Sequence, residues 1–235
     1  IATGTGELHY QWQKFGADIA GATSSSYTTP VTPIFDNGAL YSVVVTDSTG
    51  NTVTSSTATL VLSKYSLVVK PGGGTYDITE CVKDNKTGLI WEGKTASPGS
   101  TSRLGTSTYT NFDNKNAAQH FAGTGYPTQD EIDDSTNSIG YIKRVNAGSG
   151  LCGYTDWRLP TKVELLGIRD ADQTSAPQID KTWFPNTQDG SYWTSSPAGS
   201  DPSTATVIYF TSAYISGGGS RSTLYHHVRL VRGNL

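Results

Sequence analysis

Residues 149–168, SGLCGYTDWRLPTKVELLGI, constrain the fold of this chain more than any other stretch. A cysteine, a Trp-Arg pair, a proline and an amphipathic segment follow one another there. Pro160 ends an extended piece, and Thr161 with Glu164 three residues later forms the pattern of a capping box, which predicts a helix start. The side chains of that helix predicted to face the core are Val163, Leu166 and Ile168, with Leu165 partly so.

The chain has two cysteines, Cys81 and Cys152. They lie far apart and lack the close spacing of metal ligands. A composition rich in Ser, Thr and Gly is typical of exported proteins, in which disulfides form. We therefore predict a Cys81–Cys152 disulfide, which would stabilise the fold by roughly 4 kcal/mol through chain entropy. A pair of buried thiols is the alternative.

Charge and hydropathy exclude two kinds of partner. The net charge is only -3, charged residues make up 16% and no basic stripe is present, so nucleic acid is not an expected partner. No apolar run reaches the ~18 residues that span a bilayer, so direct membrane insertion is not expected. The chain has no Met, and we expect any targeting segment to lie upstream of Ile1. Residues 1–62 carry the net negative charge, and residues 63–235 are neutral.

Residues 36–62 alternate like a β-hairpin. Tyr41, Val43 and Val45 would share one face of its first strand, and the turn would fall at residues 48–51.

This first segment resembles a bacterial immunoglobulin-like repeat. Trp12 stands where the core Trp of strand C would be, and Asp36-x-Gly38-x-x-Tyr41 resembles the tyrosine corner before strand F. The resemblance implies a β-sandwich over residues 1–69, with Trp12 and Tyr41 in its core. Too few residues precede Trp12 to supply strands A and B. The domain is therefore expected to be cut short, or completed by a strand from a neighbouring chain.

Residues 70–75 read as a Gly-rich linker, and residues 76–235 as a second domain with α+β character. Helices are predicted at 113–121 and around 139–148. Short strands of an antiparallel sheet are predicted at 182–187, 192–197, 206–212 and 225–233.

The second domain resembles the Lcl C-terminal domain family, which is named after a collagen-like bacterial adhesin. The motifs that carry the resemblance are residues 87–92, 151–153, 157–161 with 164–165, 184–187, 192–196 and 228–233. The resemblance implies a C-type-lectin-like fold in secreted or surface proteins of bacteria and phages. It also implies ligand binding, with glycan or glycosaminoglycan binding for the namesake.

Several conspicuous side chains are predicted to be structural. We expect core packing for Trp157 and a buried salt bridge for Arg158, with further structural roles for Trp91, Glu164, Trp193 and Arg229. An enzyme is not expected. There is no Gly-x-Ser-x-Gly motif, and the adjacent His226 and His227 would point to opposite faces of a strand.

No cofactor is predicted. Two acidic segments, Asp130-Glu131-x-Asp133-Asp134 and Asp170-x-Asp172, could supply oxygen ligands for calcium. Solvated acidic loops are the simpler interpretation, because the Glu-Pro-Asn and Trp-Asn-Asp signatures of calcium lectins are absent.

The predicted recognition surface lies in two late loops, residues 197–205 and 213–225. Tyr, Ser and Gly make adaptable binding surfaces because Tyr offers rigid contact area and the small residues offer hydrogen bonds. The residues predicted to bind ligand are Asp201, Thr204, Tyr214, Arg221, Tyr225 and His227. Ordinary solvated loops are the alternative.

These features favour a non-enzymatic adhesin, located outside the cell or on its surface, that binds a glycan or a protein on another surface. The alternative is a structural subunit of a surface fibre, in which the incomplete first domain self-associates through strand complementation.

Overall fold

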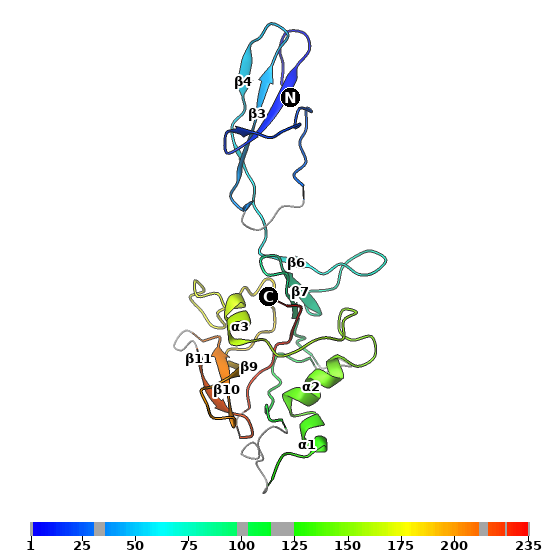
Figure 1. The fold of residues 1–235 in the computed structure, drawn as a ribbon, viewed down its shortest axis with the longest axis vertical. Helices are drawn as coiled ribbons and strands as arrows, with labels where there is room; N and C mark the ends of the chain where they lie inside the picture. Colours follow the sequence, from blue (N-terminus) through cyan, green and yellow to red (C-terminus); the bar gives the residue numbers. More distant parts are fainter. Residues whose placement is uncertain are drawn as a thin grey trace. The chain divides into compact units, whose positions relative to one another are not determined.

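The computed structural model describes residues 2–30, 36–97, 103–113, 125–211, 216–223 and 225–234. The protein is mostly β, with several antiparallel sheets and few helices. It divides into two compact units, Ile1–Lys64 and Tyr65–Leu235 (Figure 1). The boundary lies closer to the N-terminus than the predicted linker at 70–75, because β6 (Tyr65–Leu67) pairs with β7 (Cys81–Asp84) of the second unit.

The first unit is built on one five-stranded antiparallel sheet, in the order β2-β1-β3-β4 with β5 beside β3. Its strands are β1 (His9–Lys14), β2 (Ala17–Asp18), β3 (Leu40–Thr46), β4 (Thr52–Thr54) and β5 (Ala58–Thr59). β3 and β4 form the predicted hairpin. β1 lies beside β3, as strands C and F do in an immunoglobulin sheet.

Side chains alternate across β1 and β3 as predicted. Trp12 lies opposite Val43, so the two share a face of the sheet. Tyr27 packs between Trp12 and Tyr41, with ring centroids 6.0 Å from Trp12 and 6.2 Å from Tyr41. Trp12 and Tyr41 therefore contribute to packing, although both are only half-buried.

The described residues of the first unit show one sheet and no second sheet facing it, so they do not form the predicted sandwich. The apolar residues buried there are Ala22 and Ala39, whereas Val53 is 71% exposed. Leu8, Val45 and Val53 help to line an open groove of about 500 Å³ on the sheet. One face thus lacks the cover that a second sheet would provide.

The second unit contains two sheets. One has the order β12-β8-β7-β6 and the other the order β11-β10-β9. The strands not yet placed are β8 (Ile90–Glu92), β9 (Ser191–Pro197), β10 (Thr204–Tyr209), β11 (Ser216–Ser220) and β12 (Val231–Arg232). β9 and β10 confirm two of the predicted strands, and β12 lies within a third.

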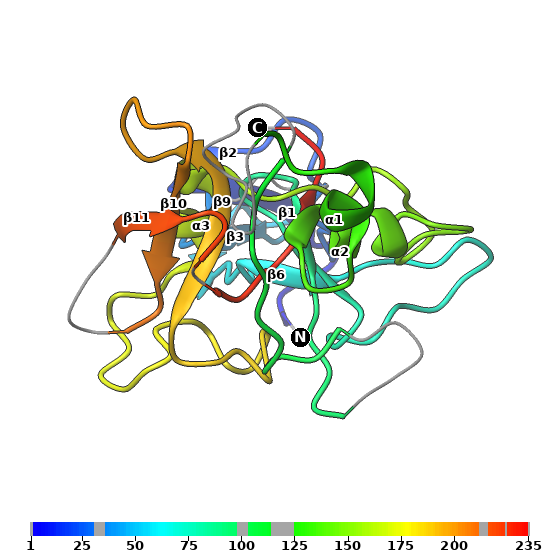
Figure 2. The same cartoon turned by 90° about the horizontal axis from the view of Figure 1, so that it is seen from below.

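Three helices accompany these sheets in the described residues: α1 (Gln129–Asp133), α2 (Ser138–Val145) and α3 (Lys162–Ile168). None of them has the length and apolarity to cross a membrane. α3 packs against β9 and β10, and α1 packs against α2 away from that sheet (Figure 2). α2 confirms the predicted helix around 139–148, whereas most of the helix predicted at 113–121 lies outside the described residues.

The start of α3 confirms the predicted capping box. The Thr161 hydroxyl accepts from the Glu164 N–H, and the Glu164 carboxylate accepts from the Thr161 N–H. Val163 was predicted to face inward, but it is 70% exposed. The buried face of this short helix instead runs through Glu164, Leu165 and Ile168, because α3 begins at Lys162 and turns that face toward the sheet.

Two local predictions in the second half are wrong. Residues 182–187 form turns instead of a strand, and the Phe184 N–H donates to the Asp180 carbonyl across them. Part of the predicted loop 213–225 is the strand β11, which pairs with β10 from Ser216 to Ser220.

A close approach explains why residue 219 of β11 is a glycine. A Cβ atom at Gly219 would lie 2.8 Å from the Trp193 ring and 2.8 Å from His226 Nε2. Trp193 is fully buried beneath this strand. Only a residue without a side chain lets the backbone pass so close to the indole.

Gly219→Ala is therefore expected to destabilise the protein by about 1–3 kcal/mol, the usual effect of overpacking a filled core. Urea unfolding measures the change. Gly218→Ala is the matched control, because its Cβ would meet only Ala198 Cβ at 3.3 Å. Equal losses in the two variants would contradict the role of Trp193.

The second unit holds two clusters of buried apolar residues. One includes Cys81, Cys152, Trp157 and Trp193. The other includes Trp91, Leu165, Phe184 and Tyr192. Cys81 and Cys152 form a disulfide, as predicted.

A network of buried charged groups lies inside this unit. The Glu92 carboxylate accepts from Lys94 Nζ at 2.8 Å, from the Tyr141 hydroxyl and from the Leu230 N–H at 2.8 Å. Arg229, predicted to be structural, is fully buried and donates to the Glu92 carbonyl and to Thr187 Oγ1, both at 2.6 Å. Burial lowers the pKa of Lys94 to about 8, and the Glu92 charge opposes that shift.

Candidate binding site

The structure brings three of the predicted ligand-binding residues together at one end of β10 and β11. Asp201 caps the turn before β10 by accepting from the Ser203 N–H and hydroxyl. The Thr204 hydroxyl donates to the Ala198 and Asp201 carbonyls. Arg221 donates from Nε to the Thr204 carbonyl and from Nη1 to the Asn111 carbonyl. Their polar groups thus bind the protein's own backbone.

The other predicted ligand-binding residues lie apart from these three or outside the described residues. His227 Nδ1 lies 3.0 Å from the Ser107 carbonyl oxygen, and its ring packs on Tyr192. Tyr225 is 58% exposed. Tyr214 lies outside the described residues. The predicted recognition surface therefore stays a prediction.

The neighbouring His226 is held in a confined place. Its Nδ1 shares a hydrogen bond with the Ser191 hydroxyl, and its ring packs edge-on against Trp193 with centroids 4.5 Å apart. In the described part of the chain, Nε2 is buried without a hydrogen-bond partner. Burial, with a smaller contribution from the charge of His227, lowers the pKa of His226 to about 4.

This shift predicts a pH dependence of stability. Between pH 6.5 and 4 the unfolded chain binds more protons at His226 than the folded chain, so stability present above pH 6.5 is lost as the pH falls toward 4. His226→Gln is expected to flatten this slope in urea unfolding, and His9→Gln, at an exposed position in β1, should leave it unchanged. An unchanged slope in His226→Gln would contradict the assignment.

The acidic segments considered for calcium are engaged locally. Asp133 pairs with Lys143, and Asp134 accepts from the Thr136 N–H and hydroxyl. Asp170 accepts from the Asp172 N–H and the Gln173 amide. Among the residues that the structure describes, no three His, Cys, Asp or Glu side chains converge as a metal site would require.

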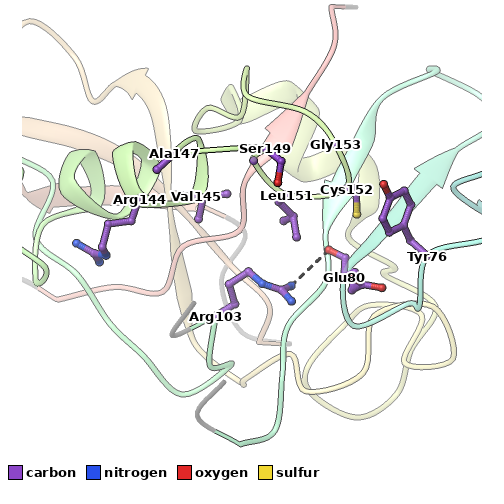
Figure 3. A pocket seen from close by; sticks show the side chains of 11 residues that line it. Tyr76, Glu80, Arg103, Arg144, Val145, Ala147, Ser149, Leu151, Cys152 and Gly153 are labelled. Atoms are coloured by element: carbon purple, nitrogen blue, oxygen red, sulfur yellow. Dashed lines mark hydrogen bonds between the residues drawn. The ribbon is translucent and has the colours of Figure 1, made fainter. Parts of the chain in front are cut away.

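An open pocket of about 440 Å³ lies beside the disulfide. Its volume falls within the range of small-ligand sites. Tyr76 and Glu80 lie on one side, and Val145 and Ala147 lie on the other (Figure 3). The lining residues are Tyr76, Glu80, Arg103, Arg144, Val145, Ala147, Ser149, Gly150, Leu151, Cys152 and Gly153.

The disulfide joins the two walls of this pocket. Cys152 belongs to the wall after α2, and Cys81 directly follows Glu80 of the opposite wall. The turn that carries Cys152 is tight, because a Cβ atom at Gly150 would lie 1.8 Å from the Tyr154 carbonyl oxygen. The pocket is thus formed by segments far apart in sequence and held at a fixed separation.

Arg103 forms the floor of the pocket and is almost entirely buried. Its Nη1 donates to the Thr79 carbonyl at 2.7 Å, the Gly93 carbonyl at 3.0 Å and the Glu80 carbonyl at 3.4 Å. Figure 3 shows the last of these bonds. The Arg103 guanidinium therefore holds residues 79–80 against the end of β8 and the residue that follows it.

Sequence reasoning did not find this pocket. Its polar groups come from Tyr76, Glu80, Arg103, Arg144 and Ser149, which belong to no continuous motif. The available signal was the Gly- and Ser-rich run 147–153 around a cysteine with a distant partner. That run predicts a loop tied to another segment, but not which side chains face it.

Other predicted structural residues lie where expected. Trp91, Trp157 and Trp193 are buried. Arg158 forms a salt bridge with Glu164 at 2.7 Å; the Glu164 side chain is 3% exposed but that of Arg158 is 37% exposed, so the predicted burial applies to one partner. Desolvation raises the pKa of Glu164, but the ion pair with Arg158 outweighs it, so the pKa is lowered.

Comparison with known proteins gives one match. The model of the Lcl C-terminal domain family matches residues 80–232. No curated protein and no solved structure matches significantly. The matched range runs from β7 to β12 and contains the disulfide, the buried charged network and most of the pocket. The chain belongs to the Lcl C-terminal domain family.

Proposed function

We propose that this protein is an extracellular, non-enzymatic adhesin whose second unit binds a glycan in the pocket beside the disulfide. Membership of the Lcl C-terminal domain family suggests a surface-associated protein. The observation that carries the proposal is the pocket itself, with walls joined by Cys81–Cys152 and polar side chains of both charge signs among its lining residues. Small-molecule sites typically combine such a preformed hollow with a few oriented polar groups.

The predicted loop surface supports this role less well than the pocket. The side chains of Asp201, Thr204 and Arg221 already bind the backbone of the unit. A ligand there would have to compete with those hydrogen bonds, and each exchange leaves little net gain. We also propose a C-type-lectin-like fold for the second unit. An antiparallel sheet with a helix packed on it, together with a disulfide that joins distant segments, is compatible with that fold.

A pair of tryptophan substitutions tests the location. Ala147→Trp would fill the pocket from an exposed position, and Ser200→Trp would cover the predicted loop surface from a comparably exposed one. Binding of the full chain to an array of neutral and sulfated oligosaccharides is measured for each. We expect Ala147→Trp to abolish binding and Ser200→Trp to preserve it. The reverse result would move the site to the loops.

We propose self-association through the first unit as a second role, because in its described residues no second sheet covers the apolar face of the first. Val53 is 71% exposed, and the groove beside it is lined by Leu8, Val43 and Val45. A strand from a neighbouring copy would cover this face and complete a surface fibre.

Negative-stain microscopy and light scattering of the full chain test the fibre role. Filaments or higher oligomers that disappear in Val45→Lys, with glycan binding retained, would support it. A monodisperse monomer at high concentration would count against it.

A further inference from the structure

We infer that the second unit binds one small monovalent anion, of the class of chloride, in its core between the side chains of Arg229 and Trp91. This site is distinct from the proposed glycan pocket, whose lining includes neither residue. Two observations in the described part of the chain point to it: a buried guanidinium with no carboxylate in contact, and two buried N–H groups without acceptors. The stability of the unit should then depend on the anion in solution.

Arg229 carries its positive charge in a fully buried position. Its Nη1 donates to the Glu92 carbonyl and its Nη2 to Thr187 Oγ1, both at 2.6 Å. Among the residues that the structure describes, no carboxylate lies within ion-pair distance of this guanidinium. Arginine stays protonated in proteins, and a buried charge without a counter-charge in contact is strongly unfavourable. An anion in contact with Arg229 would relieve that cost.

The nearby Glu92 carboxylate does not fill this role, because its oxygens are already used. Oε1 accepts from Lys94 Nζ at 2.8 Å and from the Tyr141 hydroxyl, and Oε2 accepts from the Leu230 N–H at 2.8 Å. One carboxylate therefore accompanies two buried cations, Lys94 and Arg229. Burial lowers the pKa of Lys94 to about 8, Glu92 opposes that shift, and the charge of Arg229 adds to it. The two cations thus share one electrostatic environment.

Two buried N–H groups of this region, Arg229 Nε and Trp91 Nε1, have no acceptor among the described residues. Both side chains are fully buried. Guanidinium and indole nitrogens are donors only, and buried donors in folded proteins are nearly always paired. Both groups therefore require an acceptor. An anion accepts from several donors at once, and the positive charge of Arg229 favours an anion over a neutral water molecule.

The two donor side chains lie on the same side of the sheet. Val231 pairs with Trp91 across β12 and β8, and Arg229 precedes Val231 by two residues, so its side chain shares the Trp91 face. The packing agrees, because the Arg229 guanidinium lies 5.1 Å from the ring centroid of Phe184, which belongs to the same apolar cluster as Trp91. Leu230, the residue after Arg229, packs in the other cluster. In apolar surroundings a contact between a cation and an anion is stronger than in water.

Urea unfolding of the full chain at pH 7 and fixed ionic strength tests the site, with sodium chloride replacing sodium gluconate, whose anion is too large for a buried site. Each tenfold increase in chloride above its dissociation constant should lower the unfolding equilibrium constant about tenfold. Trp91→Phe removes one donor and keeps an aromatic ring, so it should raise the chloride concentration required at least about tenfold. Trp157→Phe is the matched control and should keep the wild-type dependence, because the buried Trp157 Nε1 already donates to the Leu151 carbonyl at 3.0 Å.

Crystals grown in sodium bromide locate the anion directly. We expect an anomalous bromide peak in contact with Arg229 Nε and Trp91 Nε1. Density at that place without an anomalous signal would identify an ordered water molecule and overturn the anion site. Unfolding curves that coincide in chloride and gluconate would also overturn it, as would an equal loss of chloride dependence in Trp91→Phe and Trp157→Phe.

Discussion

Replacing both cysteines, in the variant Cys81→Ala/Cys152→Ala, is expected to lower the free energy of unfolding by about 4 kcal/mol. The two residues are 71 positions apart, so the disulfide removes a large loop entropy from the unfolded chain. Urea unfolding monitored by tryptophan fluorescence measures the change, because Trp157 and Trp193 belong to the same apolar cluster as both cysteines.

The disulfide also has an expected effect on binding. Since it joins the two walls of the pocket, the double variant should bind glycan more weakly than the wild type even where both are folded. A dithiol reductant should reproduce both losses in the wild type and have no further effect on the variant. A double variant that loses less than about 1 kcal/mol would contradict the stabilising role.

Glu92→Leu is expected to destabilise the second unit by about 3–5 kcal/mol. The change removes the carboxylate that accepts from Lys94, Tyr141 and the Leu230 N–H, all in a fully buried position. Lys94 would then be a buried cation without its counter-charge. Urea unfolding at pH 7 provides the measurement.

The double variant Glu92→Leu/Lys94→Met is the informative control. Removing both partners eliminates the unpaired charge, so this variant should be more stable than Glu92→Leu alone. The single variant should also gain stability as the pH rises above neutrality, because burial favours the neutral amine of Lys94. A double variant less stable than the single one would show that the charges are not coupled.

The features predicted well from sequence are those encoded by neighbouring residues. The capping box at Thr161 and Glu164 depends on a spacing of three residues, which local hydrogen bonding satisfies. β9 and β10 follow from short runs separated by Gly, Ser and Asp turns. The disulfide was predictable because only one pairing exists for two cysteines.

The features that sequence reasoning missed depend on contacts between distant segments. β11 resembles a loop in sequence, and it is a strand because Gly219 lets the backbone pass over Trp193. The outward position of Val163 follows from where α3 meets β9 and β10. Glu92 and Lys94 lie in a short segment that has no unusual pattern, and their burial depends on Tyr141 and Arg229.

The binding pocket was missed for the same reason. Its walls are residues 76–80 and 144–153, which only the disulfide and the packing of the unit bring together. Loops 197–205 and 213–225 were predicted to form the recognition surface because Tyr, Ser and Gly are common in binding surfaces. Composition alone does not reveal whether polar groups such as those of Thr204 and Arg221 are already bonded within the fold.

Nuclear magnetic resonance of the ¹⁵N-labelled full chain tests the central claim most directly. Amide shifts are followed while the oligosaccharide with the strongest array signal is added. If the pocket is the site, the largest shifts will occur at residues 76–80 and 147–153, on both sides of the disulfide. Shifts concentrated at residues 198–204 and 221–227, with the pocket amides unchanged, would contradict it.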